Sequence, residues 1–501
     1  MKMCAAILSV ALLLSACSSS RHNRDTLVIG ISGSLNLGTN NPVVIQRNAN
    51  VWETLTELDD SLTPRPQLAE SWQVSPDGRQ WTFHLRKDVQ FQDGTPLSAA
   101  LVVDNIRRLK AHPELDYYST FAHLASATAR DESSVELRFE RPLVDLPGKV
   151  GHYFAGIFSP SAIGPDGKLR APVGSGPYEF VESRIGQYDR VKAFERFHGG
   201  RPFFREVEFR IIPDPAVRVM SLLRGDIDVI AHHGGVPVSY VPMLKAKPEI
   251  VVASQDVAIT HYLLFNCKRR PFAERDCRDK FDRMLDRNGM ASTILRGSGT
   301  AAHDFMISSA VRWDRSRFSP SPDTQARPCE ASQPVVLLLS QSDMSSWGYR
   351  YVADYLADYF GRAGLPIRIE SLEAGAWQKA VQQGQFDLTL YPLSMPTGTP
   401  ELLIRRLAFS KGMRVRGIGN STGYSSPEVD SLFDEAVGAP NLAAQEARFN
   451  AILDLLAREK PFVPLYHERY YYAYRRGLTG IRVDPFLKLD LAAIRWERPP
   501  R

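Results

Sequence analysis

The first half of the chain is marked by short segments in which apolar and polar residues alternate. Trp81, Phe83 and Leu85 are separated by polar residues, so one face of this segment is apolar and is expected to be buried. The sequence Ser-Pro-Asp-Gly at residues 75–78 suits a tight reversal. Residues 72–91 are therefore predicted to form a β-hairpin. Further strands are predicted at residues 26–32, 135–139, 178–182, 188–193, 207–212 and 228–231.

Helical periodicity marks several longer segments. In residues 98–109 the apolar positions share one stripe, and Ser98 can cap the amino end of the helix. Other elements predicted from periodicity are helices at 216–224 and 350–362 and strands at 335–339, 367–371 and 386–391. The alternation of strands and helices in the second half predicts a partly parallel sheet with helices on its faces. The apolar and aromatic run at 461–474 is predicted to be a strand that returns to the first half.

The amino terminus has the features of a bacterial lipoprotein signal. A lysine is followed by an apolar stretch at residues 4–13, too short to cross a bilayer comfortably, and by Leu-Ser-Ala-Cys at 14–17, which resembles a lipobox. In such a signal the cysteine, here Cys17, is acylated and becomes the first mature residue. We therefore predict a signal peptide at residues 1–17, a flexible tether at 18–25, and an extracytoplasmic protein held on the membrane by lipid.

Size, charge and motifs narrow the class of protein. With 501 residues the chain is long enough for two or more domains. Its formal net charge of +5 is small and is not gathered in a basic tract, which gives no support for nucleic-acid binding. The sequence contains no phosphate-binding loop, H-E-x-x-H element or G-x-G-x-x-G after a strand. We therefore expect a protein without enzymatic activity and without a resident cofactor.

Three cysteines follow Cys17, and an oxidising compartment would permit a disulfide. Cys267 and Cys277 are the nearest pair in the sequence and are therefore the candidate pair, although spacing does not determine the pairing. Cys329 would then keep a free thiol. The absence of a Cys-x-x-Cys pair argues against a zinc site.

A series of motifs runs through the chain in order. They are LAESW (68–72), SPDG (75–78), WTFHLR (81–86), VQFQDG (89–94), GSGPY (174–178), IPDP (212–215), GDID (225–228) and GYSSPEVD (423–430). In kind and in order these motifs resemble the signature of the family 5 solute-binding proteins, which are the peptide-, nickel- and opine-binding components of ABC importers. The resemblance covers nearly the whole predicted mature chain.

The resemblance implies an α/β protein with the two-lobed periplasmic-binding-protein fold of type II, in the large peptide- and nickel-binding class. Lobe I would comprise residues 26–255 and 468–501, with an extra subdomain at 66–170, and lobe II residues 256–467. A monomer would enclose its ligand between the lobes and deliver it to the permease and ATPase subunits of an importer. The tryptophan-containing hairpin would be scaffold, since its apolar face has to be buried.

The resemblance leaves the ligand open. Gly-Gln-Tyr-Asp at residues 186–189 resembles the nickel-binding branch, so nickel or another divalent metal with a small organic chelator is the first candidate. However, residues 156–160 lack the arginine, and residues 409–420 the histidine, that this branch would imply. A di- or oligopeptide is the second candidate, although residues 392–399 contain no carboxylate to pair with a peptide amino group. A surface lipoprotein that uses this fold without transport is a third alternative.

Polar candidates for ligand binding lie in predicted loops. Arg414, Arg416 and Asn420 lie in an expected cleft loop, where guanidinium groups can bind carboxylates in a bidentate manner. The alternative is that the arginines face solvent. His232 and His233 follow a predicted strand, and imidazole is a good ligand for nickel, copper or zinc. The alternative is a surface turn.

Aromatic side chains supply the remaining candidates. Tyr391 closes a predicted strand, and Tyr118, Tyr153 and Trp377 are further possible walls of the cleft. Aromatic rings stack on ligands, which makes them suitable for such walls. Packing in the protein core is the alternative for the last three.

Overall fold

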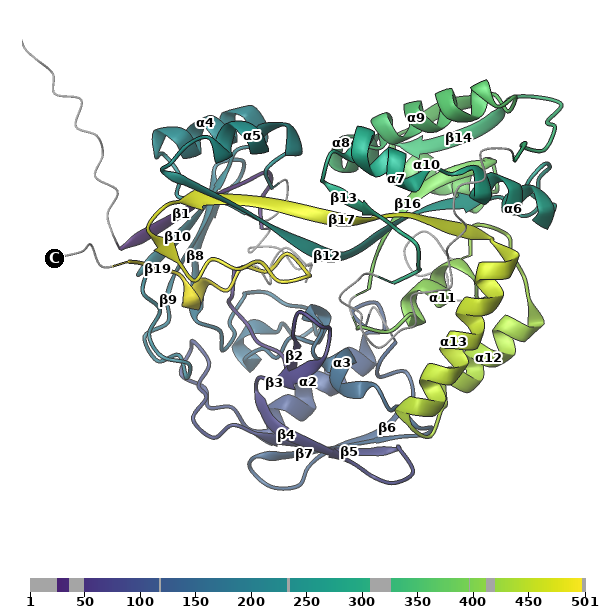
Figure 1. Ribbon diagram of the computed structural model, residues 1–501. Coiled ribbons are helices and arrows are strands. Elements are labelled where there is room, and N and C mark those ends of the chain that lie inside the picture. Colours follow the sequence, from purple (N-terminus) through teal and green to yellow (C-terminus); the bar gives the residue numbers. More distant parts are fainter. Residues whose placement is uncertain are drawn as a thin grey trace, which may run out of the picture.

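The computed structural model describes residues 25–35, 49–116, 119–231, 235–306, 326–395, 397–410 and 420–497. Two lobes are bridged by a pair of long strands, β12 (Ile250–Phe265) and β17 (Phe462–Arg475) (Figure 1). A smaller subdomain, built on a sheet of its own, lies below both lobes in this view (Figure 1).

One mixed sheet extends through both lobes. Its strands follow the order β15-β14-β16-β12-β17-β11-β1-β10-β9-β8, and β13 (Gly299–Ala301) pairs with β17 outside this path. β12 and β17 pair antiparallel over most of their length, so the same two strands belong to the sheet of each lobe. Their register shifts between Asp256 and Thr260, midway between the lobes.

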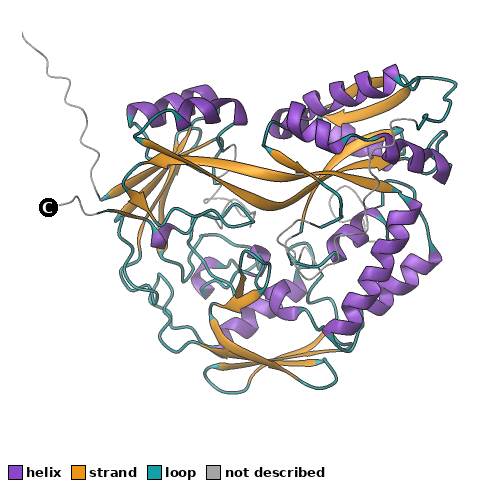
Figure 2. Ribbon diagram, viewed as in Figure 1, coloured by secondary structure: helices purple, strands orange, loops and turns teal. Residues whose placement is uncertain are grey.

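In the first lobe, three parallel strands form the centre of the sheet and two antiparallel strands form its edge. Two helices pack on one face through the apolar residues that they share with β1, β11 and β12 (Figure 2). The first of these helices begins at Asp214, whose side chain accepts a hydrogen bond from Val217 N. The elements are β1 (Thr26–Ile31), β8 (Tyr178–Arg184), β9 (Tyr188–Ala193), β10 (Glu206–Ile211), β11 (Val229–Ile230), α4 (Pro215–Arg224) and α5 (Val241–Lys245).

In the second lobe, the central strand β14 is covered on both faces. Leu337 and Leu339 belong to the large core that contains the apolar side of α9, whereas Leu338 points to the cluster under α10. A strand buried on both faces is typical of a parallel sheet between helices. The elements are β14 (Val335–Ser340), β15 (Ile367–Leu372), β16 (Leu388–Ser394), α6 (Arg275–Met284), α7 (Arg287–Met290), α8 (Gln341–Trp347), α9 (Tyr349–Arg362), α10 (Ala374–Gln382), α11 (Glu401–Leu407), α12 (Pro427–Val437) and α13 (Leu442–Glu459).

The subdomain is a sheet in the order β4-β5-β7-β6 covered by α2. Trp81 and Phe83 of β5 are buried in its core, and the Trp81 indole donates a hydrogen bond to the Leu143 carbonyl at 2.9 Å. Ser98 caps α2 by accepting a hydrogen bond from Leu101 N. The elements are β4 (Ala69–Val74), β5 (Gln80–Leu85), β6 (Leu124–Ala129), β7 (Ser134–Phe139), α2 (Ala99–Ala111) and α3 (Leu146–Val150), and the remaining short strands are β2 (Thr56–Leu58), β3 (Pro64–Pro66), β18 (Leu478–Thr479) and β19 (Arg495–Trp496).

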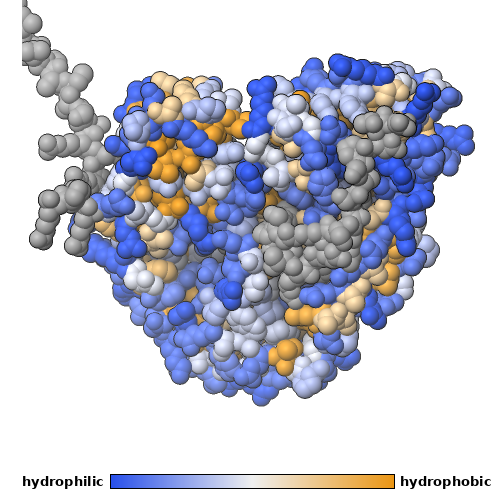
Figure 3. Space-filling model, in the orientation of Figure 1, coloured by the Kyte–Doolittle hydropathy of each residue, from blue (hydrophilic) through white to orange (hydrophobic). Residues whose placement is uncertain are grey.

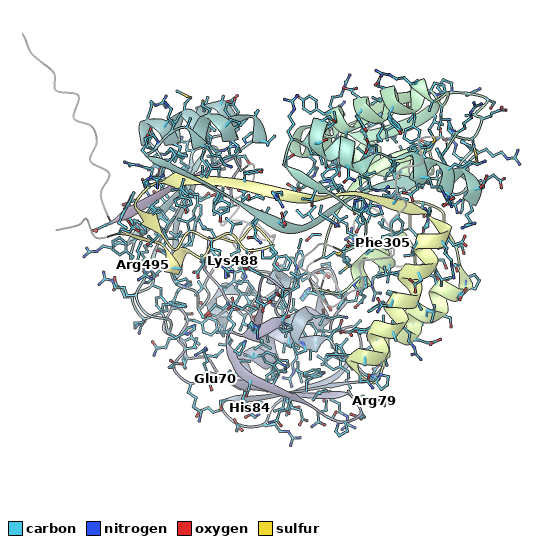
Figure 4. All side chains as sticks on the ribbon, viewed as in Figure 1. Glu70, Arg79, His84, Phe305, Lys488 and Arg495 are labelled. Atoms are coloured by element: carbon cyan, nitrogen blue, oxygen red, sulfur yellow. A yellow bond between two sulfur atoms is a disulfide. The ribbon has the colours of Figure 1, made fainter. Side chains whose placement is uncertain are left out.

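The predicted hairpin, the Ser98 cap and the return strand near the carboxyl terminus are confirmed. The hairpin lies at the end of the molecule opposite the bridging strands, where Glu70, Arg79 and His84 are labelled (Figure 4). This position and the burial of Trp81 agree with a scaffold role for the motif.

The predicted pairing of Cys267 with Cys277 is wrong. Cys277 is bonded to Cys329, with their Cα atoms 5.5 Å apart, although 52 residues separate them in the sequence. Cys267, by contrast, follows β12, and its thiol faces the Phe265 carbonyl at 3.8 Å. Burial raises the pKa of the Cys267 thiol to about 11, so it is protonated at neutral pH. The prediction from sequence proximity failed because Cys277 lies on helix α6, where Cys329, and not Cys267, reaches it.

Candidate functional site

Strands of both lobes end where β12 and β17 bridge the molecule. β11 is antiparallel to β17, with Ile230 opposite Ala473, so its carboxyl end points to the middle of β17. β16 is antiparallel to β12, with Ser394 opposite Ile259, so it ends at the irregular stretch of β12. β1 and β14 run parallel to β11 and β16. Ligands of open α/β sheets bind outside the carboxyl ends of strands, which makes the region beside the bridging strands the candidate site.

Backbone contacts fix the centre of this region. The N–H of Ala258, in β12, donates to the Pro485 carbonyl at 2.7 Å, and the Ala258 carbonyl accepts from Met395 N at 2.9 Å. Pro485 and Lys488 lie in the loop between β18 and β19, and Figure 4 shows Lys488 below the bridging strands. On the opposite side of these strands the surface is notched between the lobes (Figure 3).

A buried histidine joins β12, β17 and the helices of the second lobe. His261 is 1% exposed, and its two ring nitrogens lie 2.8 Å from Tyr349 Oη and 3.1 Å from a carboxylate oxygen of Glu468. Its ring stacks on Tyr466, with centroids 4.2 Å apart, and meets Trp347 edge-on. Because both nitrogens have partners, His261 is held as part of the framework rather than offered as a metal ligand.

Asp343 lies near this histidine, and Tyr391 and Arg406 continue the polar contacts away from it. Burial raises the pKa of Asp343, and the charge of His261 lowers it by less. Burial and then the charge of Asp343 raise the pKa of Tyr391, whose hydroxyl accepts a hydrogen bond from Arg406 at 3.2 Å. Burial lowers the pKa of Arg406 to about 10, so the guanidinium stays charged at neutral pH. The carboxyl of Asp343 on α8, the phenol of Tyr391 within β16 and the guanidinium of Arg406 on α11 therefore form a polar cluster, called here the polar wall.

The structure places three predicted ligand-binding residues. Tyr391 lies on β16 in the polar wall. Asn420 stabilises a turn, since its side-chain amide donates to the carbonyls of Ala408 at 3.2 Å and Tyr424 at 2.6 Å. Trp377 is 6% exposed and packs between α10 and β14, which leaves its indole little surface for a ligand.

The other predicted residues lie outside what the structure describes. These are Cys17, Tyr118, His232, His233, Arg414 and Arg416, together with the side chain of Tyr153, whose backbone belongs to the short helix Tyr153–Ala155. Their roles stay predictions. No pattern in the sequence indicated Asp343 or Arg406, and the one available signal for His261 was a histidine inside the apolar strand sequence ITHYLLF.

A buried ion network joins the subdomain to the second lobe. Lys149 of α3 lies 2.6 Å from a carboxylate oxygen of Glu401 on α11 and 3.5 Å from Asp145. Arg405 contacts the same Glu401 carboxylate at 2.5 Å. Burial would raise the pKa of Glu401, but Lys149 and Arg405 outweigh burial and lower it from 4.5 to about 2. For Asp145 burial prevails over Lys149, and its pKa is raised.

Comparisons with known proteins were made for the sequence and for the fold. The sequence profile of the bacterial extracellular solute-binding proteins, family 5, matches residues 63–414. The peptide transport periplasmic protein SapA of Salmonella typhimurium is 24% identical, over 96% of this chain and 94% of its own. The probable D,D-dipeptide-binding periplasmic protein DdpA of Escherichia coli is 24% identical, over 84% of this chain and 82% of its own.

Solved structures share the fold over nearly the whole chain. NikA from Brucella suis in complex with Fe(III)-EDTA has a TM-score of 0.81 and 20% identity, covering 94% of this chain and 100% of that one. A dipeptide-binding protein from Pseudoalteromonas in complex with Met-Leu has a TM-score of 0.76 and 19% identity, with the same coverage. These likenesses confirm the predicted two-lobed periplasmic-binding-protein fold of type II.

No helix among the described residues has both the length and the apolar character needed to cross a membrane. Nor do three or more His, Cys, Asp or Glu side chains within the described ranges gather in a way that could hold a metal ion.

Proteins of the matched family are the substrate-binding components of ABC importers for peptides or nickel chelates, and they work with permease and ATPase subunits. The relatives found are transport proteins rather than enzymes. The profile match covers more than half of the chain and agrees with the motifs read from the sequence. The chain therefore belongs to family 5 of the bacterial extracellular solute-binding proteins.

Proposed function

We propose that this protein captures a small zwitterionic ligand between its lobes and delivers it to the permease of an importer. The observation that carries the proposal is the polar wall of Asp343, Tyr391 and Arg406, which lies where α8 follows β14 and where α11 contacts β16. A guanidinium binds a carboxylate in a bidentate manner, and a carboxyl group can accept a hydrogen bond from an amino group. One wall thus offers a partner to each end of an amino-acid-like ligand.

Closure around the ligand would use the bridging strands as the hinge. Lobe I is proposed to comprise residues 26–255 and 468–501, with the subdomain at 66–170, and lobe II residues 256–467. The proposed boundary on β12 coincides with its register shift after Asp256. A local irregularity in an otherwise regular strand pair is a place where backbone angles can change without breaking the rest of the sheet.

Two kinds of ligand fit this chemistry. The first is nickel or another divalent metal held by an amino-acid-like chelator, whose carboxylates would meet Arg406 together with the predicted Arg414 and Arg416. The histidine pair His232 and His233 could add direct metal contacts. The second is a di- or oligopeptide, which is supported by the names of relatives such as the glutathione-binding protein GsiB, 24% identical over 87% of this chain.

Ligand-induced stabilisation separates the two candidates, because a ligand of the native state raises stability in proportion to ln(1 + [L]/Kd). The purified protein would be melted with nickel alone, with nickel and L-histidine, and with a mixed dipeptide pool. A melting shift with nickel and histidine that exceeds nickel alone supports the chelate. A shift confined to dipeptides supports the peptide. If none of the three raises the melting temperature, both candidate ligands are excluded at the concentrations used.

Replacing Arg406 with glutamine is expected to weaken binding of the ligand identified in this way at least tenfold, because a charged hydrogen bond contributes roughly 1.5–3 kcal/mol. Isothermal titration calorimetry measures the change. Arg368→Gln, on an arginine whose side chain is 63% exposed, is the matched control and should bind as the wild type does. Equal affinities of Arg406→Gln and wild type would remove Arg406 from the site.

We also propose that the protein is anchored on the extracytoplasmic side of the membrane through an acylated Cys17. The Cys17→Ala change is expected to abolish incorporation of labelled palmitate and to move the protein from the membrane fraction to the soluble fraction. Cys4→Ala, within the predicted signal peptide, serves as the control and should leave both unchanged. Membrane retention of the Cys17→Ala protein would contradict lipid anchoring at this residue.

A further inference from the structure

A cavity of about 200 Å³ lies at the junction of the subdomain with the second lobe. Its subdomain side includes Thr120, His123, Arg141 and Lys149, and its other side includes Glu401 and Arg405 of α11. Asp343, Tyr391 and Arg406 of the polar wall do not line this cavity, although Arg406 belongs to the same helix α11 as Glu401 and Arg405. Because both sides are needed to enclose it, the cavity exists when the subdomain and α11 are in contact.

Positive charge prevails around this cavity. Three cations line it, namely Arg141, Lys149 and Arg405, against the single lining carboxylate of Glu401. That carboxylate is already shared between Lys149 and Arg405, at 2.6 and 2.5 Å. His123 is paired with Glu140 at 3.5 Å on the rim.

Arg141 has no counter-ion within this arrangement. In the part of the chain that the structure describes, its guanidinium makes neither a hydrogen bond nor an ion pair. Burial and the nearby Arg405 both lower its pKa, and the charges of Glu401, Asp434 and Glu140 oppose this only in part. The five N–H donors of this half-buried guanidinium therefore make no bond within the described protein and can bind an acceptor that enters the cavity.

We propose that this cavity is a second ligand site, which binds a small oxyanion such as phosphate or a short dicarboxylate through Arg141. A guanidinium offers paired N–H donors that match the oxygens of both kinds of anion. Arg405 lines the same space from α11, so a bound oxyanion would add a contact between the subdomain and the second lobe. The site would stabilise the arrangement in which these two parts touch.

Melting of the full chain in sodium phosphate or sodium succinate, against sodium chloride of equal ionic strength, tests the proposal. At least one oxyanion is expected to raise the melting temperature in a saturable way, and chloride is not. The phosphate and succinate arms tell the two classes of anion apart. Arg141→Gln is expected to weaken binding of the oxyanion at least tenfold. Arg141→Lys, which keeps the charge, should recover part of the lost affinity.

Two controls locate the effect. Arg138→Gln, on an exposed residue of strand β7, which ends shortly before Arg141, should keep the full oxyanion response. Arg406→Gln should also keep it, because Arg406 does not line the cavity. An equal response in Arg141→Gln, or no response beyond that of chloride, would overturn the proposal. A response lost in Arg406→Gln would assign the anion to the polar wall instead.

Discussion

Replacing Asp282 with asparagine is expected to destabilise the protein by about 3–5 kcal/mol, because it leaves two buried cations without their shared counter-ion. Asp282 of α6 is fully buried and accepts hydrogen bonds from Arg287 and Lys460. Both cations are themselves less than a tenth exposed. Lys460 follows α13, so the carboxylate ties α6 to the end of a helix far away in sequence.

Urea unfolding of the Asp282→Asn protein and of the wild type measures this effect. Asp276→Asn, in the same helix but with a side chain 72% exposed, is the control and should change stability by less than about 0.5 kcal/mol. Burial would raise the pKa of Asp282, but Arg287 and Lys460 outweigh it and hold the pKa below 3.8. The Asp282 carboxylate therefore stabilises the folded state above pH 3.8. The difference in the free energy of unfolding between Asp282→Asn and the wild type should narrow below that pH. A loss no larger than that of Asp276→Asn would show that the buried triad adds no stability.

Local patterns in the sequence predicted most of the regular elements. The strands of the hairpin were found because Trp81, Phe83 and Leu85 alternate, and α2 was found because Ser98 precedes an apolar stripe. Strand β12 was not predicted at all, because its first half is partly exposed and its second half is buried on both faces. A strand that passes from one lobe to the other has no single period along its sequence.

The candidate site was harder to predict than the fold because its groups come from distant segments. His261 meets Tyr349 and Glu468, which lie 88 and 207 residues further along the chain. Arg406 was not noticed because a helical arginine is usually solvated, and nothing local indicates that it reaches Tyr391. The prediction of the disulfide failed for a similar reason, since only the fold brings Cys329 close to Cys277.

Replacing Lys149 with methionine is the second change expected to have a large effect, a loss of about 3 kcal/mol in stability. The methionine keeps much of the volume of the stem but leaves Glu401 with Arg405 as its remaining partner and Asp145 with none. Neither oxygen of Asp145 accepts a hydrogen bond in the described structure, so this carboxyl relies on the lysine charge. The loss is placed at the lower end of the range for broken buried pairs because Asp145 can take up a proton.

The pH dependence of this loss distinguishes the ion network from simple packing. The folded-state pKa of Glu401 is lowered from 4.5 to about 2, so its contribution is complete above pH 4.5 and disappears as the pH falls toward 2. The Lys149→Met protein lacks most of this contribution, and the difference from wild type should therefore shrink between pH 4.5 and the acid limit of folding. Lys280→Met removes a lysine from an exposed i,i+4 pair with Asp276 and should be nearly neutral throughout. Because Lys149 and Glu401 connect the subdomain to α11, a deficit that stays constant with pH would mean that the junction is held by apolar contacts rather than by charge.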